Sequence, residues 1–244
     1  MDQTMQRAGN FLPRVDETEG ARNEVDRRVV SLTAPASGAA EQYRALYYRL
    51  ERMRELRPMK VIALCSALPG EGKTVTAVNL ALTAARANLD RRILLVDADL
   101  RRSQVAKVLG FRSKPGLSEL LQGECEIQDA VRHFRATRLT ALPSGASTEE
   151  PSQLLAGRRM KDLLRAVRDN FDEVYIDLPP SLPFADAAIL GPQTDGVLMV
   201  IRAGSTSSRQ VSLALEHLAG AAVVGCVLNG AEGSATPYLK SYAR

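Results

Sequence analysis

The chain has 244 residues, 45% of them hydrophobic and 25% charged, which is enough for one buried core and too few for two large domains. Its 32 basic residues give a net charge of only +4 and are spread along the chain, which does not indicate a nucleic-acid-binding surface. Neither a run of 18 apolar residues nor an apolar signal-peptide segment occurs, so we expect a cytoplasmic protein that does not cross a membrane by itself.

The N-terminal part of the chain changes character near residue 38. Residues 1–38 mix charge with Gly, Pro, Ala and Ser, so we predict a flexible arm that contributes little to the core, with one short strand over Arg28–Leu32. Apolar residues then recur at helical spacing among tyrosines and arginines until Pro58. This pattern predicts an amphipathic interaction helix over residues 41–57.

The middle of the chain alternates short apolar runs with helical segments. The predicted strands are VIALCS at 61–66, RILLVDAD at 92–99, LTALP at 139–143, EVYIDLPP at 173–180, GVLMVIRAG at 196–204 and VVGCVLN at 223–229. The main predicted helices cover 74–87, 151–168, the surroundings of Asp186, and 209–218. Continuous apolar runs separated by helices predict a doubly wound α/β fold with a mostly parallel sheet of about six strands.

These elements define the expected domain organisation. We predict a single domain over residues 39–230, because the alternation of strands and helices continues without a linker. The tail, residues 231–244, returns to Gly, Ser, Ala and Pro and offers no apolar face, so we expect it to be flexible and exposed.

The cysteines and histidines do not indicate a metal site. Cys65, Cys125 and Cys226 stand at no metal-ligand spacing, and we expect them to be small buried hydrophobic residues. His133 and His217 are isolated from other ligand-type residues in the sequence. We interpret both histidines as structural or surface residues.

The segment ALPGEGKT follows the first predicted strand and leads directly into a helix. A phosphate-binding loop needs glycines that let backbone N–H groups surround anionic oxygens, and here Gly70 and Gly72 supply them. Lys73 is suited to the β- and γ-phosphates and the Thr74 hydroxyl to Mg²⁺. The usual first glycine of the pattern is replaced by Ala67, but the GKT end is intact.

A dinucleotide-binding fingerprint is the alternative interpretation of this loop. GEG is a G-x-G, and Asp97 follows about 25 residues later at the end of the second predicted strand. The third glycine of that fingerprint is missing, and it has no need of Lys73 and Thr74. The sequence therefore favours the phosphate-binding loop.

Three aspartates follow predicted strands. Asp97 and Asp99 are two residues apart, so on an extended strand they point the same way at the carboxyl edge, where ligands of open α/β sheets bind. Asp177 closes a later strand and is suited to hold Mg²⁺. Each acid alone could be a turn former or, for Asp99, a helix cap, but together they predict a cation site beside the phosphate loop.

Taken in order, these motifs resemble the bacterial tyrosine kinases that accompany polysaccharide co-polymerases in capsule and exopolysaccharide export. ALPGEGKT is similar to that family's Walker A motif, ILLVDADLRR to its second aspartate motif and YIDLPP to its Walker B motif, with Leu178 where threonine is usual. LPSGAS, EPSQLL, SLPFADAAIL and VVGCVLN continue the similarity, which extends from Glu41 to Asn229. The resemblance implies a P-loop NTPase fold of the SIMIBI, or deviant Walker, type.

The resemblance also implies ATP and Mg²⁺ as cofactors and a role for each site residue. The implied nucleotide-binding residues are Pro69, Gly70, Glu71, Gly72, Lys73, Thr74, Val75 and Asn229, the last at the adenine. The implied metal-holding residues are Thr74, Asp97 and Asp177, and the implied catalytic residues are Lys73, Asp97 and Asp99. From its position alone, Asn229 could equally be an ordinary turn residue.

In this family the kinase phosphorylates tyrosines in the tail of a neighbouring copy, and here Tyr238 and Tyr242 match that cluster. Alternatively, both are plain surface residues. The resemblance implies a homo-oligomer, activation by a membrane chain-length regulator, and a location at the inner face of the membrane through that partner. The family's assembly helix repeats Glu, Arg and Arg, whereas this chain has Glu41, Arg44 and Tyr47.

ATPases of the Par and Min type share the fold and the second aspartate motif, and they are the competing interpretation. Their loop carries an additional lysine that reaches a partner's nucleotide, and Leu68 stands at that position here. The tail also lacks the amphipathic helix that membrane-surface ATPases use. Both differences favour a kinase over a nucleotide-switched binding protein.

Overall fold

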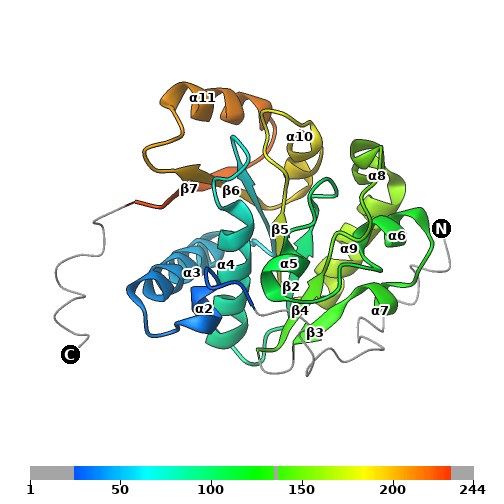
Figure 1. The fold of residues 1–244 in the computed structure, drawn as a ribbon, viewed down its shortest axis with the longest axis horizontal. Helices are drawn as coiled ribbons and strands as arrows, with labels where there is room; N and C mark the ends of the chain where they lie inside the picture. Colours follow the sequence, from blue (N-terminus) through cyan, green and yellow to red (C-terminus); the bar gives the residue numbers. More distant parts are fainter. Residues whose placement is uncertain (1–24, 135–136, 232–244) are drawn as a thin grey trace.

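The computed structural model describes residues 25–134 and 137–231, and Figure 1 shows their arrangement. The strands are β1 (Val61–Ser66), β2 (Ile93–Asp97), β3 (Arg132–Phe134), β4 (Leu139–Leu142), β5 (Glu173–Asp177), β6 (Gly196–Arg202) and β7 (Val223–Asn229). The helices of the first half are α2 (Val30–Thr33), α3 (Gly38–Leu56), α4 (Lys73–Ala87), α5 (Val105–Leu109), α6 (Leu117–Gln122) and α7 (Ile127–Ala130). Those of the second half are α8 (Pro151–Ala156), α9 (Arg158–Asn170), α10 (Asp186–Leu190), the 3-10 helix η1 (Gly191–Gln193) and α11 (Ser208–His217).

One seven-stranded sheet runs through the molecule in the order β3-β4-β2-β5-β1-β6-β7. All neighbouring strands are parallel except β3, which pairs antiparallel with β4. The predicted α/β fold with a mostly parallel sheet is confirmed, and all six predicted strands are present. The seventh strand, β3, was missed because its three residues include Arg132 and His133 and show no apolar run.

Helices cover both faces of the sheet and bury two apolar clusters. On one face, α3, α4 and α5 pack against β1, β2 and β5 through residues such as Leu50, Leu80 and Val105. On the other face, α6, α9 and α10 contribute residues such as Leu120 and Leu163. A central strand such as β1 is therefore buried on both faces, which explains its continuous apolar run.

The segment from residue 25 differs from the predicted arm and strand. It forms the short helix α2, and the Val29 side chain is fully buried against the α4 face. Asn79 of α4 holds it: Asn79 Oδ1 accepts from Ser31 N at 2.8 Å, and Asn79 Nδ2 donates to Arg28 O at 2.9 Å. The strand prediction over Arg28–Leu32 is wrong because a buried amide side chain, and not a neighbouring strand, satisfies this backbone.

Two further features differ from the sequence-based expectation, namely the helix over 151–168 and the burial of the cysteines. The helix predicted over 151–168 is two helices, because the backbone is extended at Gly157 between α8 and α9. Cys65 is buried as expected and Cys125 is half-buried, but Cys226 is exposed because β7 is the last strand of the sheet.

Among the described residues, no helix has both the length and the apolar character needed to cross a membrane.

Candidate active site

The loop between β1 and α4 has the geometry of a phosphate-binding loop. Gly70 and Gly72 adopt positive φ angles of 84° and 93°, which favour glycine, and α4 begins directly at Lys73. A Cβ atom on Gly72 would lie 2.0 Å from Nδ2 of Asn229, so this position also needs glycine for space. The backbone N–H groups of the first turn of α4 are therefore available to an anion at the carboxyl edge of the sheet.

Lys73 is buried among acidic side chains at this edge. Its Nζ lies 3.0 Å from Oδ2 of Asp99, 3.5 Å from Oδ1 of Asp177 and 3.4 Å from Oγ1 of Thr74. Burial by itself would lower the pKa of Lys73, but the charges of Asp177 and Asp99 outweigh burial and raise it above its ordinary value. The lysine is therefore a fixed cation at physiological pH.

Asp97 and Asp177 are direct partners in the β2–β5 register, so the structure brings the predicted carboxylates together. Oδ2 of Asp177 accepts the Thr74 hydroxyl at 2.6 Å, while its buried Oδ1 has no hydrogen-bond partner among the described residues. Burial raises the pKa of both acids, and for Asp97 the charge of Asp177 adds to the effect. Oδ1 of Asp177 accepts no hydrogen bond from the described residues but lies 3.5 Å from the Lys73 ammonium, and with the hydroxyl and the other carboxylates it forms a donor set that fits a hard cation such as Mg²⁺.

The two aspartates of the ILLVDADLRR segment differ in what they face. The fully buried Asp97 accepts backbone N–H groups from Asp99, Gln104 and Val105 at 3.0–3.2 Å. Asp99 lines a cavity, whereas Asp97 is not among the residues that line it. The geometry thus gives Asp97 the bonding pattern of a support for the following turn, whereas Asp99, although only 3% exposed, borders the cavity.

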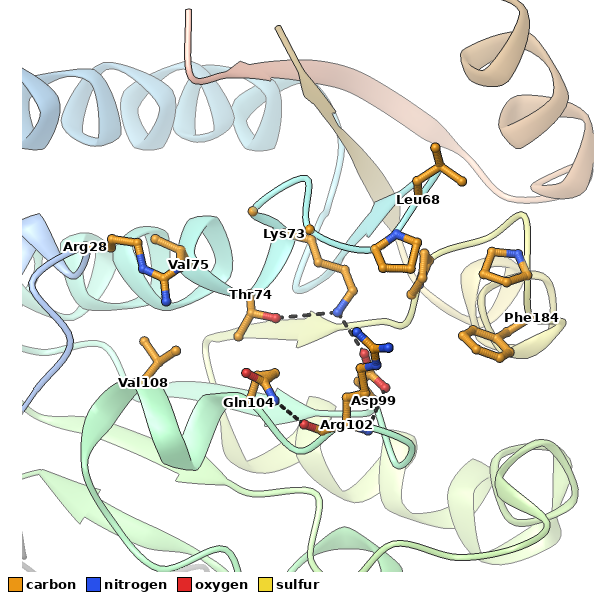
Figure 2. Close-up of a pocket in the computed structure, with 15 residues that line it drawn as sticks. Arg28, Leu68, Lys73, Thr74, Val75, Asp99, Arg102, Gln104, Val108 and Phe184 are labelled. Carbon is orange, nitrogen blue, oxygen red and sulfur yellow. Dashed lines mark hydrogen bonds and ion pairs between the residues drawn. The ribbon is translucent and has the colours of Figure 1, made fainter. Parts of the chain in front are cut away.

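The cavity has a volume of about 370 Å³ and opens beside the phosphate loop (Figure 2). The residues that line it are Arg28, Leu68, Pro69, Gly70, Gly72, Lys73, Thr74, Val75, Asp99, Arg102, Gln104, Val108, Pro180, Pro183 and Phe184. Sequence reasoning missed Arg28, Arg102 and Phe184. Arg102 is the last residue of the ILLVDADLRR motif and could have been included, whereas nothing in the sequence of the expected arm marks Arg28.

Glu71 and Asn229 fix the outer part of the loop. The Glu71 side chain is 3% exposed, and its Oε2 accepts Leu68 N at 2.9 Å while its Oε1 accepts the Thr206 hydroxyl. Asn229, at the end of β7, donates from Nδ2 to Glu71 O at 2.8 Å. Asn229 therefore contacts the phosphate loop, and the loop is tied to the segment that follows β6.

The predicted acceptors Tyr238 and Tyr242 lie outside the described residues. On α3, Arg44 forms an ion pair with Glu41 of its own helix, and Tyr47 is 2% exposed. Tyr47 thus cannot replace a surface arginine at that step of the family's assembly helix.

Comparison with known protein families and curated proteins agrees with this geometry. Residues 59–219 match the AAA domain family model AAA_31. The chain is 36% identical over 210 residues to tyrosine-protein kinase YwqD of Bacillus subtilis, covering 85% of this chain and 88% of that protein. It is 35% identical over 205 residues to the succinoglycan biosynthesis transport protein ExoP of Rhizobium meliloti, covering 82% of this chain but only 26% of that protein.

Solved structures extend the similarity. The kinase domain of Escherichia coli tyrosine kinase ETK matches with a TM-score of 0.80 and 30% identity, covering 90% of this chain and 88% of that domain. Cobyrinic acid a,c-diamide synthase of Mycobacterium smegmatis, solved with a bound ATP analogue and magnesium, matches with a TM-score of 0.53 and 25% identity over 66% of this chain and 67% of that one. The first match concerns a kinase domain of nearly the same extent, and the second a synthase that binds an ATP analogue with magnesium.

Proposed function

This chain belongs to the family of bacterial protein-tyrosine kinases, and from this premise we propose that it is an ATP-dependent autokinase acting on C-terminal tyrosines of a neighbouring copy. The observation that best supports the proposal is the buried group of Lys73, Thr74, Asp99 and Asp177 beside the phosphate loop. Fixed charges of both signs on buried side chains are what phosphoryl transfer needs, because catalysis of that reaction is mainly positioning and electrostatic stabilisation.

In the proposed mechanism the backbone N–H groups around Gly70 and Gly72 bind the phosphates of ATP. Lys73 neutralises charge on the transferred phosphoryl group, and its ion pairs with Asp99 and Asp177 hold the ammonium in place. Thr74 and Asp177, with Asp97 beneath them, are the residues that would hold Mg²⁺. When bound, the metal would neutralise charge on the phosphate oxygens.

The acceptor is a tyrosine hydroxyl, whose ordinary pKa of about 10 makes it a weak nucleophile at neutral pH. A bond forms between this oxygen and the γ-phosphorus as the bond to the ADP oxygen breaks, and the phenolic proton moves to a carboxylate. The sequence favoured Asp97 as that base. We assign the role to Asp99 instead because it lines the cavity, and we give Asp97 the task of supporting the turn that carries Asp99.

The biological setting follows from the relatives. One of them is named for succinoglycan biosynthesis transport. We infer that this kinase regulates polymerisation and export of an exopolysaccharide or capsule, at the inner face of the membrane, through a membrane co-polymerase partner that activates it. The alternative is an ATPase of the Par and Min type without kinase activity; it is disfavoured by Leu68, which takes the place of the lysine that such loops carry.

The test is to incubate the purified full chain with Mg-ATP and to map phosphate by mass spectrometry. We expect phosphotyrosine at Tyr238 and Tyr242 in the original chain, none after Lys73→Met, and none at these positions in the double variant Tyr238→Phe, Tyr242→Phe. Phosphotyrosine that survives the Lys73→Met change would exclude this active site as its source. ATP hydrolysis without phosphotyrosine, even with a membrane partner's cytoplasmic segment present, would favour the Par and Min type.

A further inference from the structure

One side of the cavity is apolar and lies beside the reacting groups. Pro180, Pro183 and Phe184, which follow β5, line the cavity together with Leu68 of the phosphate loop, and we call these four residues the ring wall. In Figure 2, Leu68 and Phe184 lie on one side of Lys73 and Asp99, opposite Arg28, Val75 and Val108. We propose that the ring wall binds the phenol ring of the acceptor tyrosine, an inference that rests on the proposed kinase function.

Contacts with Arg101 hold the ring of Phe184 in place. The guanidinium carbon of Arg101 lies 4.2 Å from the centre of the Phe184 ring, a cation–π arrangement. Arg101 is itself fixed by the fully buried Asp186, with 2.9 Å between Nε and Oδ2, and by a 3.2 Å hydrogen bond to Ser152. One part of the ring is thus anchored by a charged network, while Phe184 still lines the cavity. An aromatic side chain fixed in this way is ready to pack against a second ring.

The position of the ring wall selects a phenol. A tyrosine whose hydroxyl reaches the space between Lys73 and Asp99 must place its ring a few ångströms behind that oxygen, so an adjoining surface has to receive the ring. The ring wall lines the same cavity as Lys73 and Asp99, and its members are apolar or aromatic. Aromatic rings pack well in offset or edge-to-face geometry against such surfaces. A serine or threonine has no ring to bury there, so the ring wall would favour tyrosine as the acceptor.

The purine of ATP is the other flat ring that could occupy an apolar wall. The phosphate loop contacts Asn229 of β7 through Glu71, on the side of the loop that the family resemblance assigns to adenine. Asn229 is not among the residues that line the cavity beside Asp99. The ring wall and the expected purine position are therefore different places, and separate Michaelis constants for ATP and for the acceptor can distinguish the two occupants.

The experiment uses the full chain carrying Tyr238→Phe and Tyr242→Phe as the enzyme and a synthetic peptide copying residues 232–244 as the acceptor. Phe184→Leu keeps an apolar side chain but removes the aromatic ring, and Pro183→Ala changes an exposed member of the ring wall. We expect Phe184→Leu to raise the KM for the peptide roughly 3- to 10-fold, the value of one aromatic pair, with the KM for ATP unchanged. Pro183→Ala should raise the peptide KM by a smaller factor.

Phe111→Leu is the matched control, because this ring packs on Phe134 at 5.3 Å between centres and does not line the cavity. It should leave both Michaelis constants unchanged, and thermal unfolding of each variant shows that it is folded. An unchanged peptide KM in both Phe184→Leu and Pro183→Ala would contradict the proposed role of the ring wall in binding the tyrosine ring. The proposed kinase function would be unaffected by that result. A rise in the KM for ATP alone would assign the ring wall to the purine. If the original chain forms no phosphotyrosine, the proposed function fails and the inference with it.

Discussion

At the residue scale, Glu71 shows how one side chain can hold a phosphate loop. Both of its carboxylate oxygens are used inside the protein, one by the backbone N–H of Leu68 and the other by the hydroxyl of Thr206. The side chain is buried, so bulk water cannot freely replace a hydrogen-bond partner that is lost. Losing such a partner therefore costs free energy of folding. Glu71 therefore links the conformation of the loop to the segment between β6 and α11.

Thr206→Val should loosen this link without changing the volume of the side chain. The buried carboxylate loses one hydrogen bond, which we expect to lower the free energy of unfolding by about 1–3 kcal/mol and to weaken ATP binding several-fold. The control is Thr33→Val, at an exposed residue whose hydroxyl bonds to the carbonyl oxygens of Val29 and Arg27 and not to a buried carboxylate. Calorimetric titration with ATP and chemical denaturation provide the measurements, and equal ATP affinity in the two variants would refute the role of Glu71 as a loop clamp.

The three cysteines differ in environment, and their reactivity should follow that difference. Burial raises the pKa of the Cys65 thiol to about 12, and burial together with neighbouring acids such as Glu119 raises that of Cys125 to about 11. Only the thiolate reacts, so a higher pKa means less reactive sulfur. At about pH 8 we expect iodoacetamide to modify the exposed Cys226 first. Peptide mass mapping checks the order in which the three cysteines are modified, and Cys226→Ser should remove the fast phase of modification. Early labelling of Cys65 would contradict the expected order.

At the scale of elements, a buried ionic cluster fastens α3 to the sheet. Glu173, at the start of β5, is 1% exposed and lies 2.8 Å from both Arg54 of α3 and Arg91 before β2. Glu51 pairs with both arginines at 2.6 Å, and the hydroxyl of Tyr175 donates to Glu173 at 2.6 Å. Because the members come from three elements, the cluster fixes the position of the helix relative to the sheet.

Arg54→Met should therefore destabilise the fold strongly. The substitution keeps most of the apolar stem but removes one cation from Glu51 and Glu173, and breaking a buried ion pair from one side costs about 3 kcal/mol. For a chain of this size the melting temperature should fall by roughly 6–12 °C. Arg165→Met is the control, since its pair with Asp162 is on the surface and should contribute less than about 1 kcal/mol. Equal melting temperatures for the two variants would exclude a stabilising role for the cluster.

The elements that were predicted from the sequence are those whose signal is local. The β1, β2 and β5 runs are apolar throughout because both faces are covered, and the loop before Lys73 carries its own glycines. The missed helix α2 depends on contacts distant in sequence. The helix α2 is held by Asn79, about 50 residues away, and nothing in the arm's own sequence predicts that contact.

For the candidate site too, some features could be predicted from the sequence and others depend on the fold. The edge position of Asp97 and Asp177 followed from parallel pairing, and the β2–β5 register agrees with it, whereas Asp99 lies in the turn after β2 and does not face the same way as Asp97. The cavity wall did not follow, because Leu68 and Phe184 meet only through the fold and neither residue type is by itself a sign of a site. The bonding of Asp97 to three backbone N–H groups also depends on the turn after β2, which strand periodicity does not describe.

At the scale of the whole molecule, trans phosphorylation requires that one copy reaches another. The family's assembly pattern is incomplete here, since Tyr47 is buried in the α3–α4 interface. The outward face of α3 nevertheless carries Arg49 and Arg52, both exposed, and Tyr48, which is 59% exposed. An exposed aromatic residue among arginines is a common composition of protein interfaces. We therefore expect this face of α3 to mediate self-association.

The double variant Arg49→Glu, Arg52→Glu reverses the charge of that face without touching the nucleotide site, so assembly and chemistry can be separated. We expect sedimentation velocity to show loss of oligomers and autophosphorylation to fall about tenfold or more, because the new glutamates would repel the acidic groups of a neighbouring copy that arginines attract. Phosphorylation of a separate tyrosine peptide should continue, since a diffusing acceptor needs no second copy. Arg158→Glu, Arg165→Glu makes the same charge change on the exposed side of α9 and should leave the oligomer intact. An unchanged sedimentation coefficient in the α3 variant would mean that the copies meet through another surface.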